Sequence, residues 1–156
     1  MQHQEQHQEQ HHDLATCPLC RDVAGGAGPR LIADNEHTIT VVGEHQFFRG
    51  YCMVIARQHA REMHDLPIDV QQAVMADVFR AGRAIAQVYK PLKINYASLG
   101  NVVEHLHWHV IPRYREEADP TSHPWAEASR FKNHVTTPNE ALDAARGLAD
   151  ALICEY

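Results

Sequence analysis

Hydrophobic positions along this chain change their spacing several times, and each spacing predicts a different element of structure. Short apolar or β-branched runs bounded by Gly, Asn, Asp or Pro are typical of strands. Such runs occupy residues 31–33, 38–42, 51–56, 93–97 and 105–111. Two longer stretches, at 67–90 and 137–153, repeat their apolar residues at steps of three or four, which predicts two helices.

The ends of both predicted helices carry start and stop signals. Pro67 suits a first helical turn, and Pro91 cannot continue the helix that precedes it. Thr137, Pro138 and Glu140 match a helix start in which the threonine caps and the glutamate follows three residues later. The order β-β-β-α-β-β-α predicts an α+β domain with a largely antiparallel sheet, one long central helix and a C-terminal helix.

Other segments follow neither period. Residues 1–13 are rich in Gln, His and Glu and have no apolar residue after the first methionine, which predicts a disordered tail. Residues 115–136 contain prolines and no periodicity, so we expect a long loop there. A Gly100-Asn101 turn is expected to join the last two strands. The remaining chain, 14–156, has the length of a single domain.

Composition and charge argue against several classes of protein. The formal net charge of −6 speaks against a nucleic-acid partner, because nucleic-acid-binding proteins usually carry a basic surface. No apolar run approaches the roughly 20 residues that a membrane-spanning helix needs. The polar N-terminal segment also lacks the apolar core of a secretory signal. We therefore expect a cytoplasmic protein that binds neither membrane nor nucleic acid.

The run HLHWHVI at 105–111 is the most informative segment for chemistry. In a strand, His105, His107 and His109 would line one face, because side chains alternate between faces. Imidazole can act as a base, a nucleophile or a metal ligand near neutral pH, and an idle buried cluster of three would be costly. The run therefore predicts a metal site, a nucleophilic site, or a combination of the two.

A second motif is the C-x-x-C pair formed by Cys17 and Cys20. Such a pair outside a secreted protein is more often metal-binding or redox-active than a structural disulfide. The residues that follow, 21–26, are too short for a stable helix, which disfavours the redox interpretation. Together with His59 and His105, the two thiolates would form a tetrahedral structural zinc site. The alternative is that both cysteines are plain thiols.

Two tryptophans and several isolated histidines complete the candidates. Trp108 lies between two histidines, and we expect it to pack in the core. Trp125 lies in the predicted polar loop, where stacking on a base or closing over a pocket is an alternative to core packing. His45, like the other isolated histidines of the folded part, is expected on the surface.

The run at 105–111 resembles the signature of the histidine triad (HIT) family, H-φ-H-φ-H-φ-φ, in which φ is apolar. The segment 53–59, ending in a histidine, and the Pro112-Arg113 pair agree with this resemblance. Residues 93–101 are similar to those of small bacterial HIT hydrolases described as diadenosine tetraphosphate hydrolase-like. The resemblance implies a homodimeric HIT-like fold. It also implies a hydrolase that cleaves dinucleoside polyphosphates at the α-phosphate.

The resemblance also implies roles for individual residues. His107 would attack the α-phosphate to form a nucleotidyl-imidazole, and His109 would donate to the phosphate oxygens. His105 would hold the array or bind zinc with Cys17, Cys20 and His59, a set similar to that of some bacterial members. Contacts to the nucleotide are expected from Asn95, Ser98, Gly100, Asn101 and Trp125. The resemblance implies no organic cofactor.

Two features bear on the branch of the family and its substrate. His109 is retained where the nucleotidyl-transferase branch has glutamine, which favours hydrolysis. Val102 stands where many members have Ser or Thr, and valine cannot donate a hydrogen bond to phosphate. The alternatives are a nucleoside phosphoramidase that cleaves AMP-amine conjugates, a metalloenzyme whose triad binds a catalytic ion, and a non-catalytic nucleotide-binding dimer.

Overall fold

A computed structural model of the chain describes residues 16–131 and 133–153, so the predicted tail at 1–13 lies outside the described residues. The helices are α1 (Pro18–Arg21), α2 (Ile68–Tyr89), α3 (Ala128–Phe131) and α4 (Pro138–Ile153). The strands are β1 (Leu31–Asp34), β2 (Thr38–Val42), β3 (Cys52–Ala56), β4 (Lys93–Ala97) and β5 (His107–Arg113). The predicted α+β class and the predicted order of the long elements are therefore confirmed.

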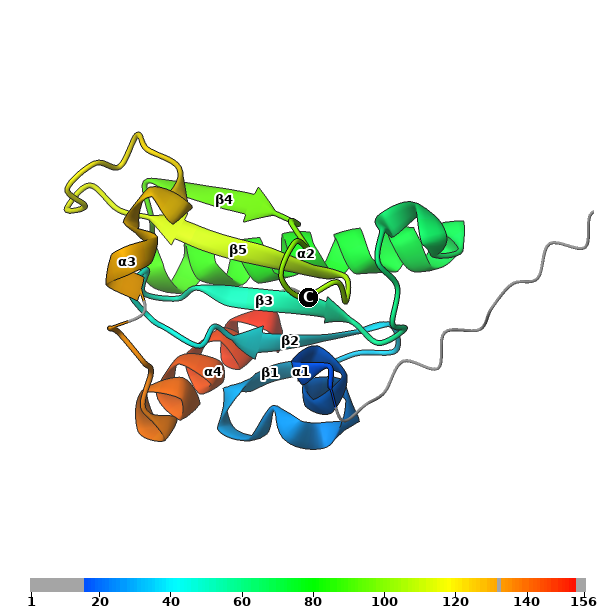
Figure 1. The fold of residues 1–156 in the computed structure, drawn as a ribbon. Helices are drawn as coiled ribbons and strands as arrows, with labels where there is room; N and C mark the ends of the chain where they lie inside the picture. The colour runs from blue at the N-terminus through cyan, green and yellow to red at the C-terminus, as the bar shows by residue number, and fades with distance from the viewer. Residues whose placement is uncertain (1–15, 132, 154–156) are drawn as a thin grey trace, which may run out of the picture.

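The strands form one sheet in the order β1-β2-β3-β5-β4, and every neighbouring pair is antiparallel (Figure 1). β5, which carries two of the histidines, lies between β3 and β4 and is therefore paired on both sides. Its His109 is opposite Met53 of β3 and Ala97 of β4. This central position fixes the direction in which each side chain of β5 points.

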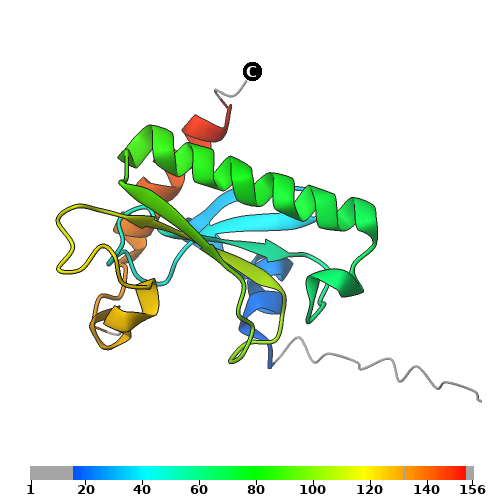
Figure 2. The same cartoon turned by 90° about the horizontal axis from the view of Figure 1, so that it is seen from above.

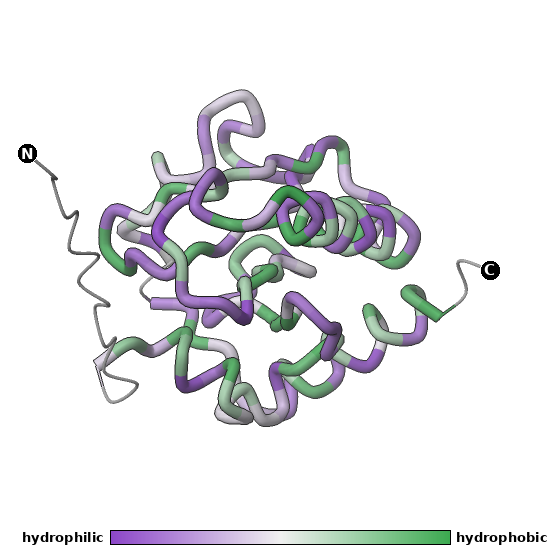
Figure 3. The backbone as a smooth tube through the Cα atoms, turned by 90° about the vertical axis from the view of Figure 1, so that its right-hand side faces the viewer, coloured by the Kyte–Doolittle hydropathy of each residue, from purple (hydrophilic) through white to green (hydrophobic). Residues whose placement is uncertain are grey.

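The two long helices cover one face of the sheet, and α1 and α3 lie on the other (Figure 2). Both long helices have a buried apolar stripe, and in Figure 3 the tube of α2 alternates between hydrophobic and hydrophilic residues. α2 begins directly after Pro67 and ends at Tyr89, and the capping residue Lys90 adopts the left-handed conformation before Pro91. Within the described residues, no helix has both the length and the apolar character needed to cross a membrane.

Alternate residues of the central strands belong to two separate apolar cores, one on each face of the sheet. Val54 and Val110 belong to the core beneath α2 and α4. Met53 and Ile111 belong to a second core on the opposite face, which also includes the two cysteines of the C-x-x-C pair. Trp108 is partly buried and packs against the core under α2, in agreement with its predicted packing role. The histidine face of β5 is therefore the face that α1 covers.

The structure corrects the predicted histidine strand and the turn before it. β5 begins at His107, and His105 precedes the strand. The connection from β4 is the segment 98–106, which is much longer than a two-residue Gly-Asn turn. Its length lets the chain leave the sheet, so that the backbone of Leu106 pairs with the segment after β3 through its N–H bond to the Ala60 carbonyl.

Two segments expected to lack helix contain short helical turns. The residues after the cysteine pair continue from α1 into a π-helical turn, Asp22–Gly26, although they were predicted to be too short for a stable helix. The predicted loop at 115–136 contains a 3-10 turn, Pro124–Glu127, followed by α3. Such short helices do not depend on intrinsic stability, because packing of buried residues such as Leu19 and Cys20 holds them in place.

Candidate active site and metal centre

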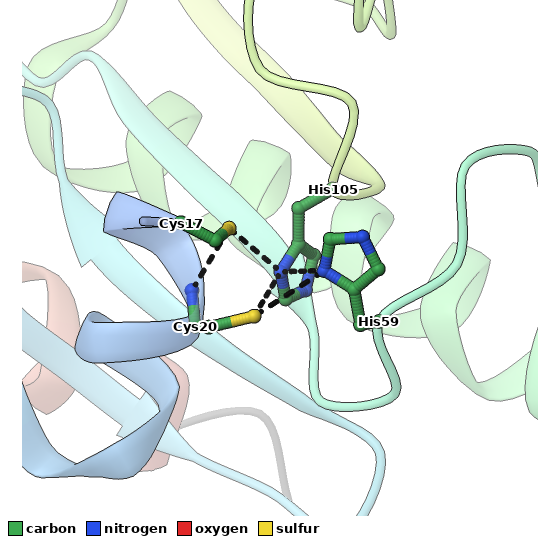
Figure 4. A group of neighbouring side chains, drawn as sticks. All are labelled: Cys17, Cys20, His59 and His105. Atoms are coloured by element: carbon green, nitrogen blue, oxygen red, sulfur yellow. Dashed lines mark hydrogen bonds between the residues drawn. The ribbon is translucent and has the colours of Figure 1, made fainter. Parts of the chain in front are cut away.

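Four side chains from distant parts of the sequence point toward one another on the face covered by α1 (Figure 4). Cys17 immediately precedes α1, Cys20 lies within it, His59 follows β3, and His105 precedes β5. Their potential ligand atoms all lie within 4.8 Å of one another. Among the residues that the structure describes, no other His, Cys, Asp or Glu group of this kind is found. The structure thus brings together the four residues of the predicted metal set.

The spacing of these atoms fits a tetrahedral metal ion. Zn–S bonds of about 2.3 Å and Zn–N bonds of about 2.05 Å would place S and N ligands about 3.6 Å apart and two N ligands about 3.4 Å apart. Nδ1 of His105 lies 3.6 Å from Sγ of Cys17 and 3.2 Å from Sγ of Cys20. The Nδ1 atoms of His59 and His105 are 3.1 Å apart. These distances are close to the edges of such a tetrahedron, and no two of the four ligand atoms are more than 4.8 Å apart, so small side-chain shifts would place all four around a central ion.

The surroundings of the cluster also suit a metal. Nε2 of His105 lies 2.6 Å from the carbonyl oxygen of Ala56, and because a carbonyl can only accept, Nε2 carries the proton. Nδ1 is then left with a lone pair facing the thiols, which is the tautomer a metal ligand requires. Burial, and then the neighbouring Cys17 thiol, raise the pKa of Cys20 to about 11. A bound cation would reverse this effect by stabilising the thiolate.

The other two histidines of the run face a separate space. His107 and His109 lie on the same face of β5, and their Nε2 atoms are 3.2 Å apart. Nδ1 of His107 lies 2.7 Å from the carbonyl oxygen of His105, so that in the neutral ring the proton is on Nδ1 and the lone pair is on Nε2. A lone pair on His107 Nε2 requires the N–H to be on the Nε2 of His109. The pair therefore presents one nucleophilic nitrogen and one donor, side by side.

The far end of this pair is held by Tyr51, whose hydroxyl lies 2.7 Å from Nδ1 of His109. Burial and the positive form of His107, followed by that of His45, would disfavour a charged imidazole at His109. Desolvation is the largest of these effects, and together they lower the pKa of His109 to about 4. His109 is therefore neutral near pH 7 and acts as a hydrogen-bond donor rather than a cation.

The two imidazoles open into a cavity of about 770 Å³, which is large enough for a nucleotide-sized ligand. Three parts of the chain form its walls: the segment from α1 to β1, the start of β3 with the residues before it, and the loop between β4 and β5. A fourth contribution comes from Trp125, whose ring meets that of His109 edge to face at 5.3 Å. Charged side chains on the walls are Arg21, Asp22, Arg30 and Glu44, and Nη2 of Arg30 donates to both carboxylate oxygens of Asp22.

The predicted nucleotide contacts divide into two groups. Gly100, Asn101 and Trp125 line the cavity. Asn95 and Ser98 are not among the cavity-lining residues. The side-chain oxygen of Asn95 instead accepts a hydrogen bond from Nη1 of Arg113 at 3.1 Å. Neither the family resemblance nor the polar-loop position that suggested Trp125 can distinguish a residue that lines the cavity from one that supports its rim.

The structure also adds site residues that the sequence did not suggest. Tyr51 was assigned only to a strand, and His45 was expected on the surface, yet both line the cavity and their rings are 4.9 Å apart. Met53 lines it as well. Tyr51 and Met53 share a face of the β3 segment, and Met53 is opposite His109. Alternation along β3 could have suggested this, but only after the pairing of β3 with β5 was known.

Comparisons with known proteins agree with this geometry. The family model described as HIT domain matches residues 28–116, which is more than half of the chain. An AP-4-A phosphorylase from Mycobacterium tuberculosis is 28% identical over 128 residues, covering 68% of this chain and 65% of the relative. An adenosine 5'-monophosphoramidase from Schizosaccharomyces pombe is 26% identical over 103 residues, covering 65% and 77%.

A solved structure shows the same fold. The crystal structure of a Zn-bound histidine triad family protein from Mycobacterium smegmatis superposes with a TM-score of 0.67 at 21% identity. The match covers 89% of this chain and 94% of that protein. It therefore includes almost all of the described elements.

Proposed function

We propose that this chain, which belongs to the HIT domain family, is a nucleotide hydrolase acting on dinucleoside polyphosphates. The observation that carries the proposal is the hydrogen-bonding of His107. Its Nδ1–H is committed to the carbonyl oxygen of His105, so its Nε2 lone pair faces the cavity beside the donor of His109. Neutral imidazole with a free, oriented lone pair is a competent nucleophile toward phosphorus.

The proposed reaction has two displacements at one phosphorus. Nε2 of His107 forms a bond to the α-phosphorus while the bond to the bridging oxygen breaks, and that oxygen leaves with the remaining phosphates. Water then bonds to the same phosphorus, the N–P bond breaks, and its electron pair returns to Nε2. One proton of the water is released, and a nucleoside monophosphate departs. Dividing the hydrolysis in this way replaces one difficult step by two easier ones.

His109 is proposed to stabilise charge during both displacements. Its Nε2–H, which meets His107 in the free protein, would turn to a non-bridging phosphate oxygen when substrate is bound. A fixed donor aimed at developing negative charge is worth more in a partly buried site than in water. The depressed pKa of His109 supports a neutral N–H as this donor.

The leaving group is the finer part of the proposal. One relative is named an AP-4-A phosphorylase and another an adenosine 5'-monophosphoramidase, so names alone do not separate a polyphosphate from an amine. Val102 is 96% exposed at the cavity and has no hydroxyl to offer a proton. A polyphosphate leaves as a stable anion, whereas an amine must be protonated as it leaves. The polyphosphate is therefore preferred, with the AMP-amine conjugate as the alternative.

The four-residue cluster is proposed to hold a structural zinc ion. Two thiolates and two imidazoles are a ligand set typical of zinc, and all four protein positions are filled, which is the mark of a structural site. His105 turns its lone pair toward the cysteines and away from His107, which speaks against one catalytic ion shared by the triad. The homodimer and the cytoplasmic location implied by the resemblance stay predictions.

The first test is the replacement of His107. We expect His107→Ala to abolish release of AMP from diadenosine tetraphosphate and from an AMP-amine conjugate, because the variant loses the imidazole whose Nε2 lies beside the donor of His109. His64→Ala is the matched control, since the His64 ring is 82% exposed and does not line the cavity.

A second readout is the covalent intermediate. Mass spectrometry of the acid-quenched wild-type protein should show an added nucleoside monophosphate that His107→Ala lacks. Undiminished turnover in His107→Ala would refute the assignment. Absence of turnover and of the adduct in the wild type, with nucleotide still bound, would leave the non-catalytic nucleotide-binding dimer as the better description.

A further inference from the structure

Tyr51 is a buried polar side chain at the edge of the histidine pair, and the mechanism above gives it no role. It lies directly before β3 and is 6% exposed. Its ring is stacked near that of His109, with centroids 6.0 Å apart and an interplanar angle of 24°. Gly43 lies against this ring so closely that a Cβ there would be 2.2 Å from two ring atoms. The absent side chain at Gly43 therefore leaves the space in which the Tyr51 ring is held.

The direction of the hydrogen bond between Tyr51 and His109 follows from its neighbours. Burial, above all, raises the pKa of Tyr51, so its hydroxyl keeps its proton at neutral pH and can donate. At the other side of the ring, Nε2 of His109 meets Nε2 of His107, which has a lone pair because its Nδ1–H is bonded to the His105 carbonyl. A second lone pair at 3.2 Å would be repulsive, so the proton of His109 must be on Nε2.

We propose that Tyr51 is a positioning residue that donates its hydroxyl to Nδ1 of His109 and thereby holds the His109 proton on Nε2, where it faces the nucleophile and its phosphate. This inference rests on the proposed function, because it assigns Tyr51 to the reaction of that same site. The hydrogen bonds run in one direction, from the Tyr51 hydroxyl through His109 and His107 to the carbonyl of His105. Each group donates once, and the series of hydrogen bonds ends on a carbonyl oxygen. Because this oxygen can only accept, the direction of the series is fixed.

The hydroxyl is needed most when substrate separates the two imidazoles. In the free protein, the lone pair of His107 by itself favours the Nε2–H form of His109. When a phosphate occupies the space between them, that interaction is lost, and only Tyr51 opposes transfer of the proton to Nδ1. A His109 ring in the Nδ1–H form would turn the lone pair of its Nε2 toward the phosphate oxygens and repel them.

The tautomer can be measured directly in the full-length protein labelled with 15N-histidine. Long-range 1H–15N correlation spectra distinguish a protonated Nε2 from a protonated Nδ1, and a His109→Gln spectrum identifies the His109 signals. We expect wild-type His109 to be the Nε2–H form at neutral pH. Addition of a non-hydrolysable AMP analogue should leave this unchanged in the wild type. In Tyr51→Phe with the same analogue, the Nδ1–H form should become populated.

Tyr114→Phe is the matched control, because the Tyr114 hydroxyl donates to the carbonyl of Arg49 and not to a histidine. Tyr51→Phe should lower kcat by about two- to tenfold, the fold-change that corresponds to one hydrogen bond of ordinary strength, and leave KM unchanged. Tyr114→Phe should change neither kcat nor the His109 tautomer. A purely structural role of Tyr51 would lower stability without altering the tautomer.

The outcomes separate this inference from the proposed function. A wild-type His109 protonated on Nδ1 overturns the inference without any variant being needed, even if hydrolysis is confirmed. An unchanged tautomer and kcat in Tyr51→Phe, with activity still lost in His107→Ala, overturns it as well. If the wild type hydrolyses no nucleotide but the tautomer responds as expected, the proposed function fails while the assignment of the proton stands.

Discussion

At the scale of single residues, the three histidines of one short run differ in their surroundings, and backbone carbonyls fix the tautomers of two of them. The carbonyl of Ala56 takes the Nε2 proton of His105, which leaves Nδ1 for the cysteines. The carbonyl of His105 takes the Nδ1 proton of His107, which leaves Nε2 for the cavity. His105 therefore contributes its ring to the proposed metal site and its backbone carbonyl to the proposed nucleophile, His107.

The depressed pKa of His109 makes folding stability depend on pH. The unfolded histidine has a pKa of 6.5 and the folded one about 4, so between these values the unfolded chain binds a proton that the folded chain does not. Stability must then fall as the pH is lowered through this range. Between pH 7 and pH 5 the loss due to His109 should be about 2 kcal/mol.

Urea unfolding of the wild type and of His109→Gln at both pH values measures this contribution. The loss on going from pH 7 to pH 5 should be smaller in the variant by about that amount, because glutamine does not titrate. The difference between the two proteins cancels the titrating groups that do not interact with His109. An equal loss in both would mean that His109 is no harder to protonate in the folded protein than in the unfolded chain.

At the scale of elements, the helices differ in what holds them. α4 carries its own signals: the backbone N–H of Glu140 donates to the Thr137 hydroxyl at 3.3 Å, and the backbone N–H of Thr137 donates to the Glu140 carboxylate at 2.8 Å. α1 spans only four residues, so its place depends on side chains that contact the rest of the molecule. The start of α4 was predictable for this reason, whereas α1 was not.

Removing the cap of α4 tests whether its own N-terminal hydrogen bonds stabilise this helix. Thr137→Ala should destabilise the protein by about 1 kcal/mol, because the N–H of Glu140 loses its acceptor. Asn139→Ala, an exposed change in the same turn, should not destabilise it. Chemical denaturation compares the two variants with the wild type. Equal stability of Thr137→Ala and the wild type would show that water replaces the threonine hydroxyl without loss.

Removal of the proposed zinc ion tests whether α1 depends on its contacts with the rest of the molecule. We expect the wild type to bind about one zinc ion per chain, and chelation or Cys20→Ser to lower Tm by about 10 °C or more. Hydrogen exchange should speed up in the segment from α1 to β1, which also forms a wall of the cavity. A structural ion predicts that these changes accompany any loss of activity.

Cys52→Ala is the matched control for the metal experiment, because Cys52 is buried in the other core, away from the cluster. It should lose some packing energy but keep its zinc, as measured by elemental analysis. Full zinc content in a Cys17/Cys20 double variant would rule out the proposed site. Reversible loss of activity on chelation, without loss of stability, would favour a catalytic ion instead.

At the scale of the whole molecule, the site exists because the sheet separates two layers. α2 and α4 fill one face and supply the larger core, and the other face holds the cysteine cluster, the histidine pair and the cavity. The long segment after β5 returns to this second face and brings Trp125 against His109. Arg113, at the end of β5, holds the segment after β5 in place through hydrogen bonds.

Arg113 is 2% exposed, and its guanidinium binds the Glu117 carboxylate at 2.6 Å and the Ser122 carbonyl at 2.6 Å. Arg113→Met should therefore cost about 3 kcal/mol or more, because it leaves a largely buried carboxylate without its partner. Arg115→Met, an exposed neighbour, is the control and should change stability little. Denaturant midpoints compare the two; similar values would mean that solvent satisfies Glu117 once Arg113 is gone.

Much of this protein was predictable from its sequence because the relevant signals are local. The period of the apolar residues, the prolines at 67 and 91 and the cap at Thr137 act within a few residues, and they predicted the long elements and their order. The set of Cys17, Cys20, His59 and His105 was also named in advance, since thiol and imidazole chemistry restricts the partners of a C-x-x-C pair.

The remainder was decided by tertiary structure, because it depends on which strands pair and in which register. The pairing of β3 with β5 places Tyr51 beside His109, and no spacing along the chain contains that contact. β5 starts at His107, two residues later than predicted, and the ring of His105 lies outside the strand at the cysteine cluster. A contact between residues far apart in sequence is selected by the packing of the whole chain. The tautomers of the three histidines depend on such contacts and are therefore set only in the folded molecule.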